Sequence, residues 1–533
     1  MFFVKKLLSE LAKIFLSQHR QRLTVVVLLV AGGVLLNHWK KIKKKAGKNW
    51  GRVKEAWNYM KLKQMVLNPK NEIKVPCMIV DLDIFDENIQ SLCGIANKYG
   101  KSLRLATKSI RCPYLIKRAY DKSNGVCQGL MCYSVFEAKL LYEMYGDAFD
   151  KNYLIAYPTL QKQDIECAFE LTQKDVCIIL MIDSGEHIQK IESVCQEYID
   201  STENKHEASQ SKLNPIRLCL DLDMSYQVLG GLFSIGAHRS RTRDSKDIFA
   251  MASSLDKCKH VQLIGVMGYE AHIAGVTDNN PFFHIPSCIV QALKLIFWQQ
   301  CRDKRQKLIE TLQSVYSNYP FDSAAKTQHS HHGHDHHHHD HAFPKIDLKF
   351  VNGGGTGLIF LKKNYFYVIC VYMYMYTYVC VNFLILGNLE MSCKDVYVTE
   401  VTAGSGLIQS QIFDYFVSNN CLPAACFALQ VTRIHSPTFL LDRGFICCQS
   451  GGFIASGNIS LDKQPVTPLS CKNPLFFDLG DPIFVRSAKA GEIAEHFTHY
   501  ILKHNSAELF LVDQNDLQSF RVPTYRGLGH VFY

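Results

Sequence analysis

Residues 176–184 read VCIILMIDS, and residues 216–223 read IRLCLDLD. Each stretch is a short run of apolar residues that ends in Asp or Ser, and helical patterns separate such runs along the chain. A short apolar run between polar residues is typical of a buried strand. Strands that alternate with helices are typical of parallel βαβ units.

The same alternation extends in both directions from these two stretches, beginning near Val75. The other candidate strands are IVDLD from residue 79, SLRLATKS from 102, GLMCYS from 129, NYLIAYP from 152, VQLIGVMGYE from 261 and LKFVNGGGTG from 348. About eight strands favour a closed barrel over an open sheet. The predicted fold class is therefore α/β, with a (β/α)₈ TIM-like barrel.

After Glu400 the helical patterns fade, and strand-like segments such as FALQVTRIHS from 427 and DPIFVRSA from 481 follow. We therefore expect the barrel over residues 70–400 and a smaller C-terminal β-rich domain over 401–533. Residues 1–60 form a separate basic segment in this division.

The net charge of +10 belongs to that N-terminal segment. Residues 1–54 contain 13 Lys and Arg and one acidic residue, Glu10, whereas the remaining chain contains 46 basic and 48 acidic residues. A nearly neutral body provides no electrostatic basis for binding a phosphate backbone, so no nucleic-acid partner is expected.

The N-terminal segment also contains fourteen uncharged residues, LTVVVLLVAGGVLL at 23–36, followed by Trp39 and a Lys-rich cluster at 40–45. The densest charge follows the apolar core, which favours an uncleaved anchor over a cleaved signal. We expect a single-pass helical membrane anchor at 23–39, with the body in the cytosol by the positive-inside tendency. A mitochondrial presequence is the alternative, because the first residues form a basic amphipathic pattern.

Two low-complexity segments interrupt the predicted barrel. The His-rich loop at 326–342 contains HSHHGHDHHHHDH and has no apolar residues to bury there. The Tyr-rich insert at 362–390 contains CVYMYMYTYVCV, and its uncharged part, residues 364–386, is long and apolar enough to qualify as a membrane span. A span inside the barrel would disrupt the βα repeat, so we interpret this segment as inserted sequence, such as a translated intron.

Candidate catalytic residues follow the predicted strands, where the chemistry of such barrels is concentrated. Lys108 lies near the end of LRLATKS, and a partly desolvated amine there can form a Schiff base. The loop VNGGGTG contains Gly353, Gly354, Gly355 and Thr356, whose N–H and hydroxyl groups can bind a phosphate. A salt-bridged lysine and an ordinary tight turn are the simpler alternatives.

Two further motifs follow strands. VMGYEAH brings Tyr269, Glu270 and His272 together, and GAHRSR contains Arg239. Tyr and His side chains at a strand end can face a ring or transfer a proton. Core packing and solvated charge are the alternatives for these residues.

Together these motifs resemble the fold-type III pyridoxal-phosphate (PLP) enzymes. The resemblance is to the group with an alanine racemase N-terminal domain, which contains D-threonine aldolases, D-serine dehydratases and bacterial amino-acid deaminase/aldolase relatives. It is carried by VPCMIVDLDIFDENI, LRLATKSIRCP, GLMCYSVFEA, MGYEAH and VNGGGTG, and in the C-terminal domain by TEVTAGSG, GGFIASG, AKAGE and VPTYRG. It covers about residues 72–533, apart from the two interruptions.

The resemblance implies an alanine racemase-like PLP-binding barrel and a D-serine dehydratase-like C-terminal β domain. Lys108 would hold pyridoxal 5'-phosphate as an internal aldimine and move a proton at the substrate α-carbon. The implied phosphate ligands are Gly353, Gly354, Gly355 and Thr356, and Tyr269 and His272 would flank the ring. Arg239 would contact the cofactor or the substrate carboxylate.

The sequence departs from this pattern at a metal ligand. Many relatives have a metal-binding His before the Lys-Ala-Gly-Glu segment, where this chain has Ser487. Relatives use zinc or manganese to polarise a β-hydroxyl, and here only Glu492 or His496 are nearby candidates to replace the ligand.

The expected function is a PLP-dependent lyase of the D-threonine aldolase or D-serine dehydratase type, acting on a small D-amino acid. An amino-acid racemase and a catalytically weak PLP-binding protein are the alternatives. The resemblance also implies a homodimer.

Overall fold

The computed structural model describes residues 59–69, 73–203, 213–228, 233–277, 280, 282, 287–315, 346–354, 388–416, 421–435, 445–449, 477–491, 498–502 and 509–511. All of them belong to one compact unit, Trp57–Ile359 with Leu386–Tyr533.

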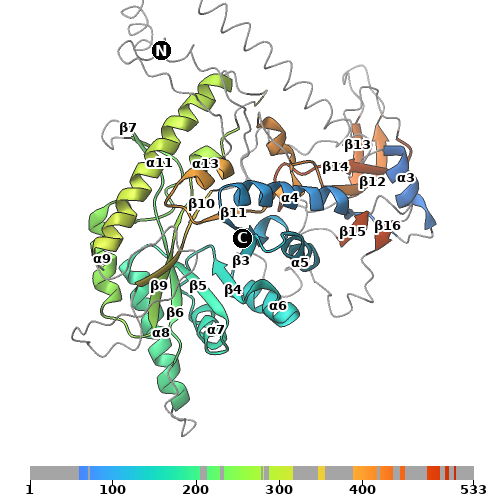
Figure 1. Ribbon diagram of the computed structural model, residues 1–533. Coiled ribbons are helices and arrows are strands. Elements are labelled where there is room, and N and C mark those ends of the chain that lie inside the picture. Colours follow the sequence, from blue (N-terminus) through green and yellow to red (C-terminus); the bar gives the residue numbers. More distant parts are fainter. Residues whose placement is uncertain are drawn as a thin grey trace, which may run out of the picture. The chain divides into compact units, whose positions relative to one another are not determined.

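Eight parallel strands close into a barrel in the order β10-β11-β2-β3-β4-β5-β6-β9 (Figure 1). Their bounds are β2 Ser102–Ala106, β3 Cys127–Cys132, β4 Asn152–Ile155, β5 Cys177–Ile182, β6 Ile216–Asp221, β9 Val261–Gly268, β10 Ile346–Gly353 and β11 Glu400–Ala403. The predicted closed (β/α)₈ barrel is confirmed.

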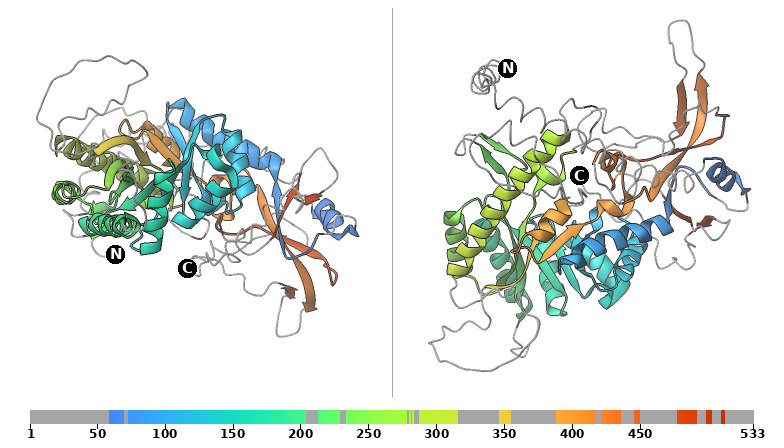
Figure 2. Two further views of the ribbon diagram at one scale, coloured as in Figure 1. Left: turned by 90° about the horizontal axis from the view of Figure 1, so that it is seen from below. Right: turned by 45° about the horizontal axis from the view of Figure 1, so that its top comes forward.

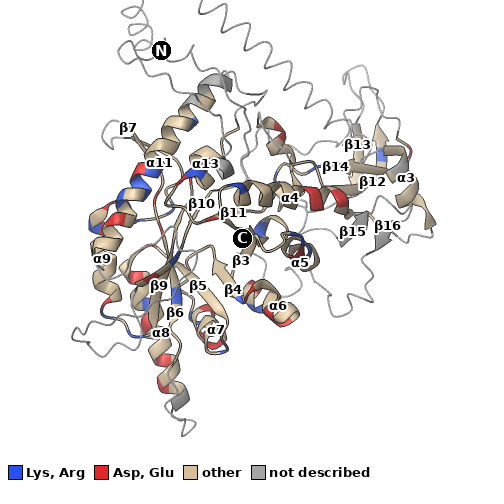
Figure 3. Cartoon of the chain, viewed as in Figure 1, with Lys and Arg blue, Asp and Glu red and all other residues tan. Residues whose placement is uncertain are grey.

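Helices surround the strands (Figure 1 and Figure 2). They are α4 Leu82–Lys98, α5 Pro113–Lys122, α6 Val135–Tyr145, α7 Lys162–Gln173, α8 Gly185–Glu203, α9 Ser245–Leu255, α11 Ser287–Val315 and α13 Asn388–Lys394. Side-chain caps fix where several of them begin: Ser134 accepts from the N–H of Glu137 at 3.2 Å, and Asp244 forms a capping box with Asp247. Basic and acidic side chains both occur along α4 and α11 (Figure 3).

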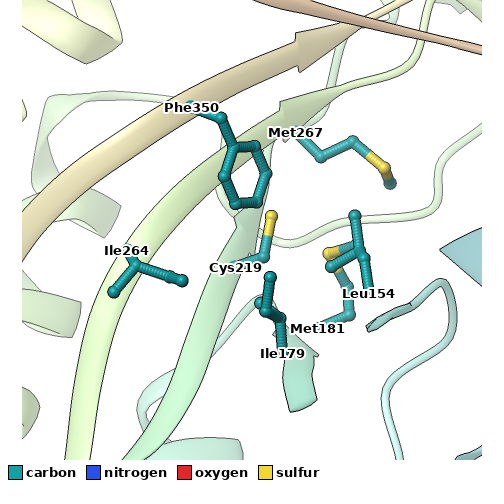
Figure 4. Packing of buried hydrophobic residues seen from close by; sticks show 7 residues of the cluster. All are labelled: Leu154, Ile179, Met181, Cys219, Ile264, Met267 and Phe350. Carbon is teal, nitrogen blue, oxygen red and sulfur yellow. The ribbon is translucent and has the colours of Figure 1, made fainter. Parts of the chain in front are cut away.

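Apolar side chains fill one part of the barrel interior (Figure 4). The cluster consists of Leu154, Ile179, Met181, Cys219, Ile264, Met267 and Phe350, which come from β4, β5, β6, β9 and β10. Space for the Phe350 ring exists because residue 265 is glycine: a Cβ there would lie 2.1 Å from Cζ of the ring. The pairing of β9 with β10 is irregular between Ile346 and Phe350, next to this contact.

A polar network fills another part of the interior. Arg104 of β2 donates to both carboxylate oxygens of Glu400 of β11, at 2.7 and 2.9 Å. Asn352 of β10 donates to the same carboxylate at 2.7 Å, and Arg104 also donates to Asn152 of β4 at 2.9 Å. Every member of this network therefore has a partner, as buried polar groups require.

A second sheet has the strand order β13-β12-β1-β15-β16, and β14 also pairs with β12. Its strands are β1 Cys77–Asp81, β12 Ala425–His435, β13 Phe445–Gln449, β14 Pro482–Val485, β15 Thr498–Leu502 and β16 Leu509–Leu511. Helix α3, Tyr59–Leu67, contacts this sheet through Tyr59, which donates to the carbonyl of Pro482 at 3.1 Å. The remaining strands, β7 Tyr226–Val228 and β8 Phe233–Ile235, form a hairpin.

The structure differs from the predicted domain division in two details. The stretch counted as the first barrel strand is β1, which pairs with β12 and β15 of the second sheet. The eighth barrel strand is β11, which continues to Ala403, past the boundary predicted at residue 400. All five residues of β1 are buried, so its apolar pattern is the same as that of a barrel strand.

The candidate membrane anchor at 23–39 and the His-rich loop at 326–342 lie outside the described residues. So does the Tyr-rich insert at 362–390, except that its last three residues begin α13. Among the helices that the structure describes, none combines the length and the apolar character needed to cross a membrane. The cysteines whose side chains the structure describes are free thiols.

The contact between Gly265 and Phe350 predicts a loss of stability for Gly265→Ala, because the methyl group would overlap the ring inside a packed core. We expect the free energy of unfolding, measured by urea denaturation, to fall by about 1–3 kcal/mol. The matched control is Gly94→Ala in α4, where a Cβ meets nothing within 4 Å. The control should be neutral or gain up to about 1 kcal/mol. A Gly265→Ala protein as stable as the wild type would contradict the packing described.

Candidate active site

The amine of Lys108 lies at the C-terminal rim of the barrel. Lys108 is in a short 3₁₀ turn, Thr107–Ser109, directly after β2, and its side chain is exposed. Its Nζ donates to the phenol oxygen of Tyr157, which follows β4, at 2.8 Å. The amine is therefore accessible from solvent and held toward neighbouring strand ends.

The backbone of Lys108 is enclosed by two other segments. The Lys108 carbonyl accepts a hydrogen bond from Arg111 Nε at 2.9 Å, and a Cβ on Gly491 would lie 2.6 Å from the same carbonyl oxygen. Ser109 hydrogen-bonds Ser405, which follows β11, at 2.9 Å. The C-terminal segment and the end of β11 thus fix the turn that carries the amine.

Aromatic rings and cations connect three of the predicted residues. The Tyr133 and Tyr157 ring centroids are 4.8 Å apart, and Lys108 Nζ lies 5.3 Å from the Tyr157 centroid. The guanidinium carbon of Arg239 lies 5.5 Å from the centroids of both Tyr157 and Tyr269. Tyr157 therefore joins Lys108 to Arg239, and Arg239 joins Tyr157 to Tyr269. Cations over aromatic faces are favourable contacts.

Tyr157 and Tyr133 were not among the predicted site residues. Both follow candidate strands, in NYLIAYP and GLMCYS, which is the same signal that selected Lys108 and Tyr269. Burial raises the pKa of the Tyr269 phenol, and the positive charge of Arg239 partly offsets this effect. Tyr269 is thus a neutral hydrogen-bonding group at neutral pH.

Asp221, at the end of β6, is a third residue near the site that was not predicted from the sequence. Burial raises the pKa of its carboxyl group to about 7, against the opposing effect of Arg239. Asp183 and Asp223 raise it further by charge repulsion. An acid with this pKa can gain or lose a proton near neutral pH, beside the cation that contacts both tyrosines.

The predicted glycine loop begins at the end of β10. Gly354 has a φ of 93°, a conformation that favours glycine, and its N–H donates to Oε2 of Glu270 at 3.0 Å. A Cβ on Gly353 would lie 3.1 Å from Cγ2 of Val398. The two other predicted loop ligands, Gly355 and Thr356, lie outside the described residues.

His272 contacts side chains of α11. It lies in the short helix α10, Ala271–Ala274, where its Nε2 is 3.6 Å from Sγ of Cys301 in α11. Its ring centroid is 5.4 Å from that of Phe297, also in α11. Burial lowers the pKa of the imidazole to about 4, so His272 is neutral at physiological pH. Lys108 is not among these contacts.

Ser487, which the sequence resemblance aligns with a metal-binding His of other proteins, is buried in a hydrogen-bonded turn. Its hydroxyl donates to the carbonyl of Lys489 at 2.7 Å, and its own carbonyl accepts from the N–H of Gln411 at 3.0 Å. Glu492 and His496 lie outside the described residues. Within the part of the chain that the structure describes, no three His, Cys, Asp or Glu side chains are grouped to hold a metal ion.

No protein-family model matches the sequence, and a comparison with curated proteins also gives no match. Solved structures do match the fold. D-threonine aldolase from Filomicrobium marinum has a TM-score of 0.54 at 13% identity, covering 82% of this chain and 94% of that chain. A variant of D-threo-3-hydroxyaspartate dehydratase has a TM-score of 0.53 at 13% identity, covering 86% and 97%.

An alanine racemase-like protein from Idiomarina loihiensis has a TM-score of 0.51 at 13% identity, covering 82% of this chain and 96% of that chain. The chain shares the fold of these proteins. This is the fold that the sequence resemblance implies, and each match covers more than four fifths of the chain.

The lowered pKa of His272 predicts a specific dependence of stability on pH. Between pH 6.5 and 4 the unfolded imidazole takes up a proton that the folded one does not, so His272 makes the folded state less stable as the pH falls. Between pH 7 and pH 5, the free energy of unfolding of His272→Gln should fall by about 1–2 kcal/mol less than that of the wild type. Urea denaturation at the two pH values measures this difference. Equal losses would show that the imidazole is not buried as described; above pH 7.5 the two proteins should respond alike.

Proposed function

We propose that the chain binds pyridoxal 5'-phosphate at the barrel rim through Lys108 and acts on the α-carbon of a small D-amino acid. The observation that carries this proposal is the connected set of Lys108, Tyr157, Arg239 and Tyr269 at the ends of different strands. It provides an exposed amine, two phenols and a permanent cation within one site.

The residues present fit the cofactor. An amine can hold the aldehyde, and the phosphate would be bound at the glycine turn after β10. The N–H of Gly354 already donates to Glu270, so Gly355 and Thr356 are the proposed phosphate ligands. Arg239 supplies positive charge between two aromatic faces. When bound, the cofactor accepts the electron pair released as a bond to the α-carbon breaks.

The remaining steps belong to the protein's own side chains. Lys108 holds the cofactor and moves a proton at the α-carbon, and the phenol of Tyr157 orients the amine by its 2.8 Å hydrogen bond. Arg239 keeps its charge whatever the state of Asp221 beside it, and Tyr269 remains a neutral phenol. For these roles, the Lys108 amine must be the proton donor and acceptor nearest to the substrate α-carbon.

We further propose that the reaction is that of a lyase, an aldolase or a dehydratase. Two of the matched proteins are named for D-threonine and D-threo-3-hydroxyaspartate, and both names describe a D-amino acid with a β-hydroxyl group. A β-hydroxy D-amino acid is accordingly the proposed substrate class. Ser487 favours a second candidate, a PLP-binding protein without turnover, because the metal-binding His of many relatives is absent there.

Product analysis of the purified full-length protein tests the proposal. With D-serine or D-threonine we expect pyruvate, or glycine plus acetaldehyde, and no product from the L forms. Lys108→Ala should abolish the activity, whereas Lys117→Ala, on the exposed face of α5 and paired with Asp121, should retain it.

Inversion of the α-carbon without cleavage would instead identify a racemase. A bound cofactor with no product from any of these substrates would favour the second candidate. Undiminished activity in Lys108→Ala would contradict the proposed site.

A further inference from the structure

A buried ion cluster lies directly against the predicted phosphate loop. Arg305 of α11 pairs with Glu270, which follows β9, and with Asp395, which follows α13. All three side chains are 0% exposed. Of these three residues, only Glu270 lies in a motif that carries the family resemblance, MGYEAH. The resemblance implies no role for it.

Each member of the cluster also holds backbone at the rim. Arg305 donates to the carbonyl of Gly268 at 3.1 Å. The second carboxylate oxygen of Asp395 accepts from the N–H of Tyr397 at 3.0 Å. Glu270, through Oε2, accepts from the N–H of Gly354 at 3.0 Å. The cluster thus connects the end of β9, the beginning of the glycine loop and the segment that leads into β11.

Gly353 also lies close to the ion cluster. A Cβ at residue 353 would lie 3.5 Å from a terminal nitrogen of Arg305 and 3.6 Å from Oε1 of Glu270. The end of β10 therefore packs on the ion pair itself. A shift of the Glu270 carboxylate would move the first turn of the loop.

One cation lies between two carboxylates in this cluster, so its formal charge is −1 and it does not itself attract an anion. A lone Glu270 carboxylate would repel a phosphate more strongly, because the Arg305 guanidinium against it offsets part of that charge. Asp395 in turn satisfies a second edge of Arg305. Hydrogen bonds to a charged acceptor are stronger than neutral ones, so Glu270 holds Gly354 firmly.

We propose that Glu270, held in place by Arg305, is a positioning residue that fixes the first turn of the glycine loop for the phosphate of the cofactor. This inference rests on the proposed function. It adds that the Glu270 carboxylate, and not the phosphate alone, fixes the backbone at Gly354. Glu270 itself makes no contact with the phosphate in this scheme.

The test compares two ligands on the full-length apoprotein: pyridoxal 5'-phosphate and pyridoxal, which lacks the phosphate. Absorbance titration gives a dissociation constant for each. Glu270→Gln should raise the constant for pyridoxal 5'-phosphate about tenfold or more, because the hydrogen bond to the loop loses its charged acceptor and the NH₂ group cannot pair with Arg305. The constant for pyridoxal should change by less than about threefold, so the ratio of the two constants reports on the phosphate loop.

Asp395→Asn is the matched variant within the cluster. It also removes a carboxylate from Arg305 but leaves the contact between Glu270 and Gly354 in place. We expect it to lower the melting temperature as Glu270→Gln does, with a change of less than about threefold in the ratio of constants. Asp86→Asn, which removes a bidentate partner of Arg118 between α4 and α5, controls for the loss of an ion pair elsewhere.

Glu270→Asp provides a second variant, since it keeps the charge for Arg305 and withdraws the oxygen from Gly354. It should change the ratio in the same direction as Glu270→Gln. An unchanged ratio in both Glu270 variants, or equal changes in Asp395→Asn, would overturn the inference and leave the proposed function intact. A wild-type protein that binds neither ligand would overturn both. Stabilisation of the wild type by inorganic phosphate, weakened in the Glu270 variants, provides a readout independent of Lys108.

Discussion

The ion pair between Arg104 and Glu400 joins the first barrel strand of the chain, β2, to the last, β11. Both side chains are buried, and removing one partner of such a pair typically costs about 3–5 kcal/mol. Asn352 and Asn152 complete its hydrogen bonds, so four strands meet at this one cation and its carboxylate. Closure of the barrel at this seam is the constraint on which the rest of the arrangement depends.

Closure matters because it brings the C-terminal ends of all eight parallel strands to one rim. Lys108 after β2, Tyr157 after β4 and Tyr269 after β9 can meet there only because β9 and β10 return to β11 and β2. Polar side chains inside the barrel, such as Arg104 and Glu400, hold the strands together, whereas Lys108 at the rim is exposed. The interior itself is filled by apolar side chains and the Arg104 network, so the rim is where chemistry can occur.

The alternation of barrel strands and helices and the positions of Lys108 and Tyr269 after strands could be predicted from the sequence, whereas contacts between residues distant in the chain could not. Lys108 and Tyr269 follow apolar runs, and the rule that chemistry gathers at strand ends is sufficient to select them. Strand β1 was assigned to the wrong sheet because a fully buried strand has one pattern in either. Arg305 and Asp395 carry no local signal: 90 residues separate them, and only the packing of α11 shows that they meet. The contact of His272 with Cys301 in α11 is of the same kind, a neighbour supplied by tertiary packing.

The central claim is that Lys108 is the point of attachment for pyridoxal 5'-phosphate. Reduction of the loaded full-length protein with borohydride, followed by peptide mass spectrometry, tests it most directly. We expect a single pyridoxyl group on the peptide that contains Lys108, and loss of both this adduct and the visible absorbance band in Lys108→Ala. A pyridoxyl group on another lysine, or an absorbance band that persists in Lys108→Ala, would contradict it.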